Sequence, residues 1–139
     1  MQFKVKNINN YEDIFSFLKP VLRKNIVFLL SGDLGAGKTT LVGYLLKNLG
    51  LNQVVNSPSF SIHNNYNIKG LTINHFDFYR LDKTMIDWEY YLYEMENSLN
   101  FIEWKHKDID LNNFKPLKII TIDISVLDEE QRIINIEGV

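Results

Sequence analysis

The chain has 139 residues, 45% of them hydrophobic and 23% charged, with a formal net charge of −2 at pH 7, and a chain of this size is expected to form one domain over residues 1–139. The slightly acidic balance disfavours a protein that holds nucleic acid by bulk charge, and the absence of cysteine excludes disulfide bonds and thiolate metal sites. Since no apolar signal region opens the chain and no apolar run approaches the roughly 20 residues that span a bilayer, we expect a cytoplasmic protein with no membrane partner.

The first half of the chain predicts a strand, a helix, and then a strand followed closely by a second helix. Residues Gln2–Lys6 alternate as in a short strand, and Tyr11–Leu22 carries apolar side chains at helical spacing. Pro20 lies inside that helical pattern and is expected to end or kink the helix. The apolar run Ile26–Leu30 is typical of a buried strand, and Lys38–Leu49 is predicted to be helical.

The second half alternates strand patterns with one helical segment, predicted over Asp87–Ser98. Strands are predicted at Ser59–Tyr66, Leu71–Phe76, Leu99–Trp104, Leu117–Val126 and Gln131–Glu137. The first two of these strands and the last two are close enough in sequence to form hairpins. We therefore expect an α/β fold whose central sheet is mixed parallel and antiparallel and is flanked by helices.

The segment Gly32–Thr39 matches the pattern G-x-x-x-x-G-K-[ST] in full and lies between a predicted strand and a predicted helix, as that motif requires. Its glycines allow backbone N–H groups to turn towards an anion, and the N-terminus of the helix adds to the positive field. Lys38 brings a charge to the β- and γ-phosphates, and Thr39 can hold Mg²⁺ through its hydroxyl. The sequence thus predicts a P-loop NTPase-like domain that binds a nucleoside triphosphate. The residues predicted to contact it are Asp33, Leu34, Gly35, Ala36, Gly37, Lys38, Thr39 and Thr40.

Two acidic residues near strand ends are candidates for the metal side of this site. A P-loop needs an acidic group at the tip of a neighbouring strand, and Asp77 follows the apolar-rich strand 71–76. If Asp77 lies beside Thr39, that strand runs parallel to strand 26–30 and its hairpin partner runs antiparallel. Glu103 lies inside an apolar strand, where burial is costly unless the carboxylate is paired or near a metal. Glu103 could therefore contact Mg²⁺ or orient the attacking water.

Plainer structural roles stay open for these side chains at the level of sequence. Asp77 could cap the strand end or pair with Arg80, and Glu103 could be an ordinary salt-bridged strand residue. Arg80 could stabilise charge on a phosphate or pair with Asp77 or Asp82. His75 could be a satisfied structural histidine or a functional one.

Four segments occur in an order that resembles one family. They are GDLGAGKTT, then NSPSF followed by Tyr66, then HFDFYRL, and then IEW, and they span the chain from about Ile26 to Lys105. Apart from the P-loop each segment is weak, but the ordered set is highly specific. The chain is similar to the TsaE family, small bacterial P-loop ATPases needed for the threonylcarbamoyladenosine modification of tRNA.

The resemblance implies a mixed-sheet fold, ATP and Mg²⁺ as ligands, and weak Mg²⁺-dependent ATPase activity that partner proteins stimulate. It also implies a complex with TsaD-like and TsaB-like proteins, in which tRNA is contacted only indirectly and ATP hydrolysis accompanies the reset of the modifying enzyme. By position, the resemblance implies Lys38, Asp77 and Glu103 as catalytic residues. On the same basis, Thr39, Asp77 and Glu103 would form the metal side of the site.

The same resemblance implies two nucleotide contacts outside the P-loop. Asn56–Phe60 would be a switch-like loop that senses the γ-phosphate, with Ser59 at the place of the family's usual threonine. Tyr11 stands where the family often has a threonine near the start of its first helix. Tyr11 is therefore a candidate contact on the adenine side of the nucleotide.

Other functions fit parts of the pattern. A small-molecule P-loop kinase could use Asp77 and Arg80 for an acceptor hydroxyl, although the chain looks too short for the usual lid and acceptor-binding insertions. A non-catalytic ATP-dependent adaptor would use ATP only to order the switch-like loop for a partner. A GTPase is disfavoured because the segment DFYR lacks the glycine of D-x-x-G and no N-K-x-D motif is present.

Overall fold

The computed structural model describes residues 1–58, 61–105 and 110–139. Its strands are β1 (Gln2–Val5), β2 (Ile26–Ser31), β3 (His63–Ile68), β4 (Leu71–Asp77), β5 (Ser98–Trp104), β6 (Lys118–Val126) and β7 (Arg132–Glu137). Its α-helices are α1 (Tyr11–Leu18), α2 (Lys38–Leu49) and α3 (Trp88–Met95), and short 3-10 helices occupy Ile8–Asn10, Lys19–Val21, Lys83–Met85 and Leu111–Phe114. Within the described ranges, none of the helices has the length and apolarity that a bilayer crossing requires.

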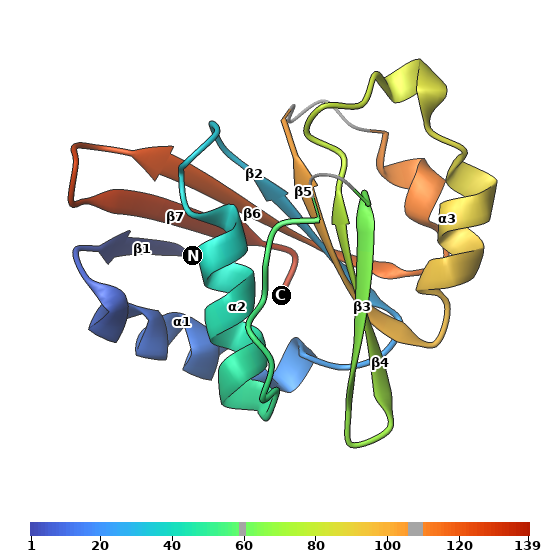
Figure 1. Cartoon of the computed structure of the whole chain (residues 1–139). Coiled ribbons are helices and arrows are strands. Elements are labelled where there is room, and N and C mark those ends of the chain that lie inside the picture. The colour runs from blue at the N-terminus through green and yellow to red at the C-terminus, as the bar shows by residue number, and fades with distance from the viewer. Residues whose placement is uncertain (59–60, 106–109) are drawn as a thin grey trace.

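The strands form one sheet in the order β1-β7-β6-β2-β5-β4-β3 (Figure 1). Its centre is parallel, because β2 pairs with both β6 and β5, and β5 pairs with β4. The outer pairs are antiparallel, with β3 on β4, β7 on β6 and β1 on β7. The predicted mixed sheet is confirmed, and so are the parallel direction of β4 relative to β2 and the antiparallel direction of β3. β5 lies between β2 and β4, so β5 is the direct neighbour of the strand that leads into the glycine-rich segment 32–37.

The sheet lies between two layers of helix (Figure 1). α1 and α2 cover one face, where Ile14, Leu45 and Phe28 belong to one buried cluster. α3 covers the other face, where Met95 and Val27 belong to a second cluster. Because β2 is covered on both faces, its consecutive residues are buried, which explains why it appears in the sequence as an unbroken apolar run.

The C-terminal ends of two predicted helices need correction. The helix predicted over Tyr11–Leu22 ends at Leu18, and Pro20 lies in the 3-10 turn that follows, as its missing N–H requires. The helix predicted over Asp87–Ser98 is α3, which stops before Asn97. That residue has a left-handed φ of 59°, so the chain turns there instead of continuing the helix.

The strand predicted over Ser59–Tyr66 is wrong at its start, because β3 begins at His63. Residues 59 and 60 lie outside the described residues, and Ile62 has a left-handed φ of 68° that interrupts an extended strand. Alternation of side-chain character in the sequence does not reveal such a turn. The other predicted strands agree with the structure to within one residue at either end.

Candidate functional site

The loop between β2 and α2 carries the glycine-rich motif. Gly32 has a φ of 151°, and a Cβ there would stand 2.6 Å from the backbone oxygen of Ile124, so glycine lets the loop pass close to β6. Gly37 caps the N-terminus of α2 with a left-handed φ of 110°. Since the helix begins at Lys38, its first N–H groups, which lack helical acceptors, lie at the end of this loop.

Lys38 is buried at the base of the loop, with 5% of its surface exposed. Its ammonium donates hydrogen bonds to the backbone oxygens of Gly32 (2.8 Å) and Asp33 (3.1 Å) and lies 4.7 Å from the ring centre of Tyr79. Burial lowers the pKa of Lys38, and nearby carboxylates, Glu103 foremost, oppose that shift. The loop thus surrounds a partly desolvated positive charge, whose attraction for a phosphate is stronger than it would be in bulk water.

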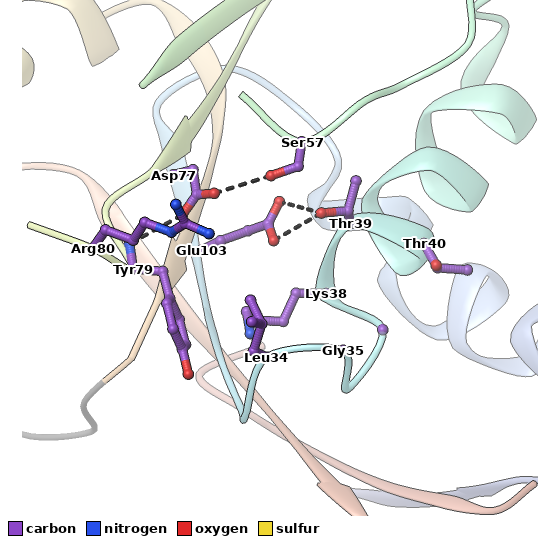
Figure 2. A pocket seen from close by; sticks show the side chains of 11 residues that line it. Leu34, Gly35, Lys38, Thr39, Thr40, Ser57, Asp77, Tyr79, Arg80 and Glu103 are labelled. Carbon is purple, nitrogen blue, oxygen red and sulfur yellow. Dashed lines mark hydrogen bonds between the residues drawn. The ribbon is translucent and has the colours of Figure 1, made fainter. Parts of the chain in front are cut away.

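The two predicted carboxylates meet at the carboxyl ends of β4 and β5, where Asp77 and Glu103 are partners in the parallel register. The hydroxyl of Thr39, in the first turn of α2, donates to Glu103, whose two oxygens lie 2.9 and 2.8 Å away. Asp77 accepts a hydrogen bond from the hydroxyl of Ser57 (3.0 Å). Figure 2 shows these two pairs side by side, with Glu103 pointing at Thr39 and Asp77 pointing at Ser57. Thr39 therefore contacts Glu103, and Asp77 occupies the next position along the same sheet edge.

A cavity of about 280 Å³ lies between the loop, α2 and these strand ends. It brings together most of the predicted site residues. Its lining consists of Leu34, Gly35, Gly37, Lys38, Thr39, Thr40, Ser57, Asp77, Tyr79, Arg80 and Glu103. Because glycine backbone, hydroxyls and charges of both signs dominate this lining, the cavity suits a polyphosphate with a cation better than an apolar ligand.

A second cavity, of about 300 Å³, adjoins the same loop and shares Gly35 and Gly37 with the first. Tyr11 and Ala36 contribute to its lining. Tyr11 is largely buried, its ring lies 5.4 Å from that of Tyr44, and burial raises the pKa of its hydroxyl. The predicted contact Tyr11 thus lies beside the loop but outside the cavity that holds the carboxylates.

The remaining predicted contacts act through the backbone or lie elsewhere. The side chain of Asp33 is exposed, while its backbone oxygen accepts from Lys38 and from the N–H of Ala36 (3.0 Å). Ala36 is buried, and its own backbone oxygen accepts from Nε of Arg132 on β7 (3.1 Å). Ser59 lies outside the described residues.

Two further contacts of the site, Ser57 with Asp77 and Arg132 with Ala36, were not predicted from sequence. Ser57 falls inside the predicted switch-like loop, but its bond to Asp77 joins residues far apart in the chain, and the NSPSF segment was the only local sign of it. Arg132 holds the loop at Ala36 across 96 positions of sequence. No local pattern marks Arg132, because the contact depends on where β7 lies in the sheet.

The structural alternatives raised for the carboxylates are partly realised. Asp77 caps its strand end by accepting from the backbone N–H of Tyr79 (3.0 Å). Glu103 is buried with 4% of its surface exposed, and its Oε2 lies 2.5 Å from Nε2 of His75. Both carboxylates therefore have protein partners and also line the cavity.

The donor set at this edge of the sheet fits magnesium. The hydroxyl of Thr39 and the carboxylates of Asp77 and Glu103 offer hard oxygen donors, which Mg²⁺ prefers. In the part of the chain that the structure describes, no group of three or more His, Cys, Asp or Glu side chains could hold a metal ion alone. Since Mg²⁺ in such sites is completed by substrate phosphates and water, the residues fit an ion that binds together with a polyphosphate.

Known proteins resemble this chain over nearly its whole length. The family model described as "Threonylcarbamoyl adenosine biosynthesis protein TsaE" matches residues 5–134. The tRNA threonylcarbamoyladenosine biosynthesis protein TsaE of Rickettsia bellii is 32% identical over 134 residues, which cover 93% of this chain and 91% of that protein. The protein of the same name from Haemophilus influenzae is 36% identical over 121 residues, 84% of this chain and 73% of that one. The crystal structure of Bacillus subtilis YdiB matches with a TM-score of 0.74 at 26% identity, over all of this chain and 85% of that chain.

Proposed function

Because the chain belongs to the TsaE family of tRNA threonylcarbamoyladenosine biosynthesis proteins, we propose that it is the ATP-binding and ATP-hydrolysing accessory subunit of that pathway. One observation supports the proposal most: Lys38, Thr39, Asp77 and Glu103 line a single cavity at the end of the glycine-rich loop. They supply the cation, the hydroxyl and the carboxylates that Mg²⁺-dependent phosphoryl transfer from ATP uses.

The phosphates of ATP bind against the loop and the first turn of α2 in this proposal. Lys38 now donates to two backbone oxygens of the loop. A phosphate oxygen would replace one or both, giving the ammonium a charged partner and a stronger hydrogen bond. Arg80, which lines the same cavity, brings a second positive charge. The adenine end would extend towards the second cavity and Tyr11.

Thr39, Asp77 and Glu103 would hold Mg²⁺, which when bound neutralises charge on the phosphates. A hydroxyl has one proton and two lone pairs, so Thr39 can keep donating to Glu103 while a lone pair faces the metal. Asp77 accepts from Ser57 and so connects the metal side of the cavity to the switch-like loop. That connection offers a route by which the state of the nucleotide reaches the protein surface.

Glu103 is the proposed group that orients the attacking water. In hydrolysis a water oxygen bonds to the terminal phosphorus, the bond to the β–γ bridging oxygen breaks, and the water gives up a proton. A carboxylate within reach can hold that water and accept the proton. Glu103 suits this task because it is buried beside Thr39 and its orientation is held by protein contacts.

The proposed partners are TsaD-like and TsaB-like proteins, with tRNA contacted only indirectly. The pathway named for the family supports a complex, and the net charge of −2 supports indirect contact with tRNA. Mixing the purified chain with such partners should give a complex that forms with ATP and weakens with ADP, and should raise the rate of phosphate release. The absence of both an ATP-dependent complex and a stimulated rate would contradict the proposal.

Replacing Glu103 distinguishes between two hypotheses for this chain, a subunit that hydrolyses ATP and an adaptor that only binds it. In the partner complex, Glu103→Ala should lower kcat by about 100-fold or more, because it removes the group that positions water and takes its proton. ATP-dependent assembly should persist at saturating ATP and Mg²⁺. Glu96→Ala, which removes an exposed carboxylate beyond the end of α3, serves as the matched control and should leave kcat unchanged. Unchanged hydrolysis in the Glu103 variant would favour the adaptor or another water-positioning group.

A further inference from the structure

His75 on β4 is fully buried and makes a polar contact inside the sheet. Its Nε2 lies 2.5 Å from Oε2 of Glu103. A buried histidine stabilises a core less than an apolar side chain of similar size unless its ring nitrogens find partners. The partner found here is one of the carboxylates that line the cavity, so the contact concerns the site as well as the fold.

The sheet register explains why this contact forms. In the parallel pairing of β4 with β5, Phe101 is opposite His75, and Glu103 is opposite Asp77. His75 and Glu103 are thus diagonal neighbours on one face of the sheet, within reach of long side chains. Thr39 of α2 approaches Glu103 over the same face. The carboxylate is therefore held by the sheet on one side and by the first turn of α2 on the other.

The two ring nitrogens of His75 differ in their hydrogen bonding, and only Nε2 has a partner among the described residues. Both oxygens of Glu103 already act as acceptors towards the hydroxyl of Thr39, so we assign the hydrogen in the contact to Nε2 of His75. Its Nδ1 is buried with no hydrogen-bond partner among the described residues. Within the described part of the chain, the polar function of His75 is thus directed to Glu103 alone. Without that donor, Glu103 keeps the hydrogen bond from Thr39 and gains the freedom to rotate about its side-chain bonds.

We propose that His75 is a positioning residue, which holds the carboxylate of Glu103 against Thr39 in the orientation that Mg²⁺ binding and water activation require. The inference rests on the proposed ATPase function, and it adds a residue that touches neither the nucleotide nor the metal. Partners of this kind, which fix the direction of a ligating group, typically change metal affinity or activity by about 10- to 100-fold when they are lost.

The test compares two replacements of His75 that differ in one donor. His75→Gln places an amide N–H near the position of Nε2, whereas His75→Leu fills similar space without a donor. Calorimetry measures ATP affinity of each folded variant with Mg²⁺ and with EDTA, and steady-state kinetics give kcat. Mg²⁺ should strengthen ATP binding in the wild type, and we expect His75→Leu to reduce this strengthening by about 10- to 100-fold. We expect kcat to fall by about the same factor. Affinity in EDTA should stay as in the wild type, and His75→Gln should recover most of both losses. If His75→Leu does not fold, His75→Asn replaces it, because its shorter amide stops short of the Nε2 position.

Asn74 provides the matched control for a purely structural effect. It is the next residue of β4, is equally buried on the opposite face, and bonds to His63, to Asn100 and to the backbone of Glu94. Asn74→Leu should lower the melting temperature and leave the Mg²⁺ dependence of ATP binding intact. An equal loss of Mg²⁺ dependence in this variant would show that any disturbance of β4 has the same effect, and would overturn the inference.

A double variant tests whether His75 acts through the carboxylate of Glu103. With Glu103→Gln already present, adding His75→Leu should cause little further loss of kcat or of Mg²⁺ dependence, because the group being positioned is gone. Fully additive losses would overturn the inference. A His75→Leu variant with the kcat and the Mg²⁺ dependence of the wild type would overturn it as well. A wild-type protein that neither binds ATP with Mg²⁺ nor hydrolyses it would instead overturn the proposed function.

Discussion

Two hydroxyl groups connect the carboxylates of the site to the segments around the glycine-rich loop. Thr39 donates to Glu103 from α2, and Ser57 donates to Asp77 from the segment before β3. A carboxylate keeps lone pairs beyond each such bond, so both side chains can gain a further ligand without losing these contacts. The protein thus brings hard oxygen donors to the cavity in orientations that neighbouring residues already set.

The hydroxyl of Tyr11 should make the free energy of unfolding depend on pH in the alkaline range. Burial raises its folded-state pKa above the ordinary value of 10.0. Above pH 10.0 the unfolded chain releases this proton while the folded chain keeps it, so the stabilisation from Tyr11 is complete below that pH and is lost as the pH rises through the folded pKa. The free energy of unfolding should therefore fall with alkaline pH less steeply in Tyr11→Phe than in the wild type. Denaturant titrations across this range measure the two slopes.

Tyr93→Phe is the control, because Tyr93 is 75% exposed on α3. It should keep the slope of the wild type. Equal slopes for the wild type and Tyr11→Phe would contradict a buried, titrating hydroxyl beside the loop.

At this scale the sequence predicts the site residues better than their partners. The glycine-rich loop can be recognised in the sequence because its residues are contiguous and match one pattern. Asp77 and Glu103 could be predicted as candidates because Asp77 follows an apolar-rich strand and Glu103 is an acidic residue inside one, but their partners could not. Thr39 meets Glu103 rather than Asp77, since β5 lies between β2 and β4. The contact of His75 depends on that same strand order.

The unit that builds the site is the strand–loop–helix β2–α2. β2 is buried on both faces and fixes the start of the loop, while α2 presents its N-terminus at the end of the loop. Between them the chain passes close to β6 at Gly32 and turns left-handed at Gly37. The backbone of the loop is therefore fixed by its two flanking elements, as the proposed phosphate site requires.

Gly32→Ala should weaken this unit. A Cβ would stand 2.6 Å from the backbone oxygen of Ile124, and the φ of 151° already disfavours a side chain. We expect a loss of about 1–3 kcal/mol in the free energy of unfolding, measured in urea. ATP affinity should fall as well, because relief of the clash moves the loop.

Gly70→Ala provides the comparison. Gly70 has a left-handed φ of 86° in the turn between β3 and β4, and a Cβ there would meet nothing within 4 Å. It should cost less stability than Gly32→Ala and leave ATP affinity unchanged. A Gly32 variant as stable as the Gly70 variant would show that the loop does not need this close approach.

Elements with strong apolar patterning could be predicted from sequence, and elements that end at unusual backbone angles could not. The strands and α2 follow from their apolar patterns, because burial on one or two faces is what those patterns reflect. The late start of β3 follows the left-handed Ile62, and the early end of α3 precedes the left-handed Asn97. Such angles cost energy that tertiary contacts must offset, so they leave no local signal in the chain.

The candidate site residues lie at one end of a parallel core. β2, β5 and β4 are parallel, and the glycine-rich loop, Glu103 and Asp77 lie at their carboxyl ends, the usual place for ligands in open α/β sheets. The antiparallel pairs at the two sides complete the sheet. Arg132 of β7 reaches the loop at Ala36, so the distant C-terminal hairpin also supports the site.

The fold class could be predicted from the alternation of elements, whereas the strand order could not. Pairing of β2 with β6 joins segments about 90 residues apart in sequence, and only packing of the whole sheet selects it. The family resemblance, carried by four short segments between Ile26 and Lys105, extends in the comparisons to residues 5–134. The family match thus reaches into the C-terminal hairpin, although that hairpin holds none of the motif segments.

Calorimetric titration of the purified chain with ATP shows whether the cavity at the glycine-rich loop is a Mg²⁺–ATP site. We expect saturable heat with one nucleotide per chain, tighter binding with Mg²⁺ than with EDTA, and loss of the signal in Lys38→Ala, whose fold is checked by circular dichroism. The melting temperature of the wild type should rise with ATP and Mg²⁺, since a ligand that binds only the folded state stabilises it. No heat from the wild type under these conditions, or equal heat from Lys38→Ala, would show that this cavity is not the proposed Mg²⁺–ATP site.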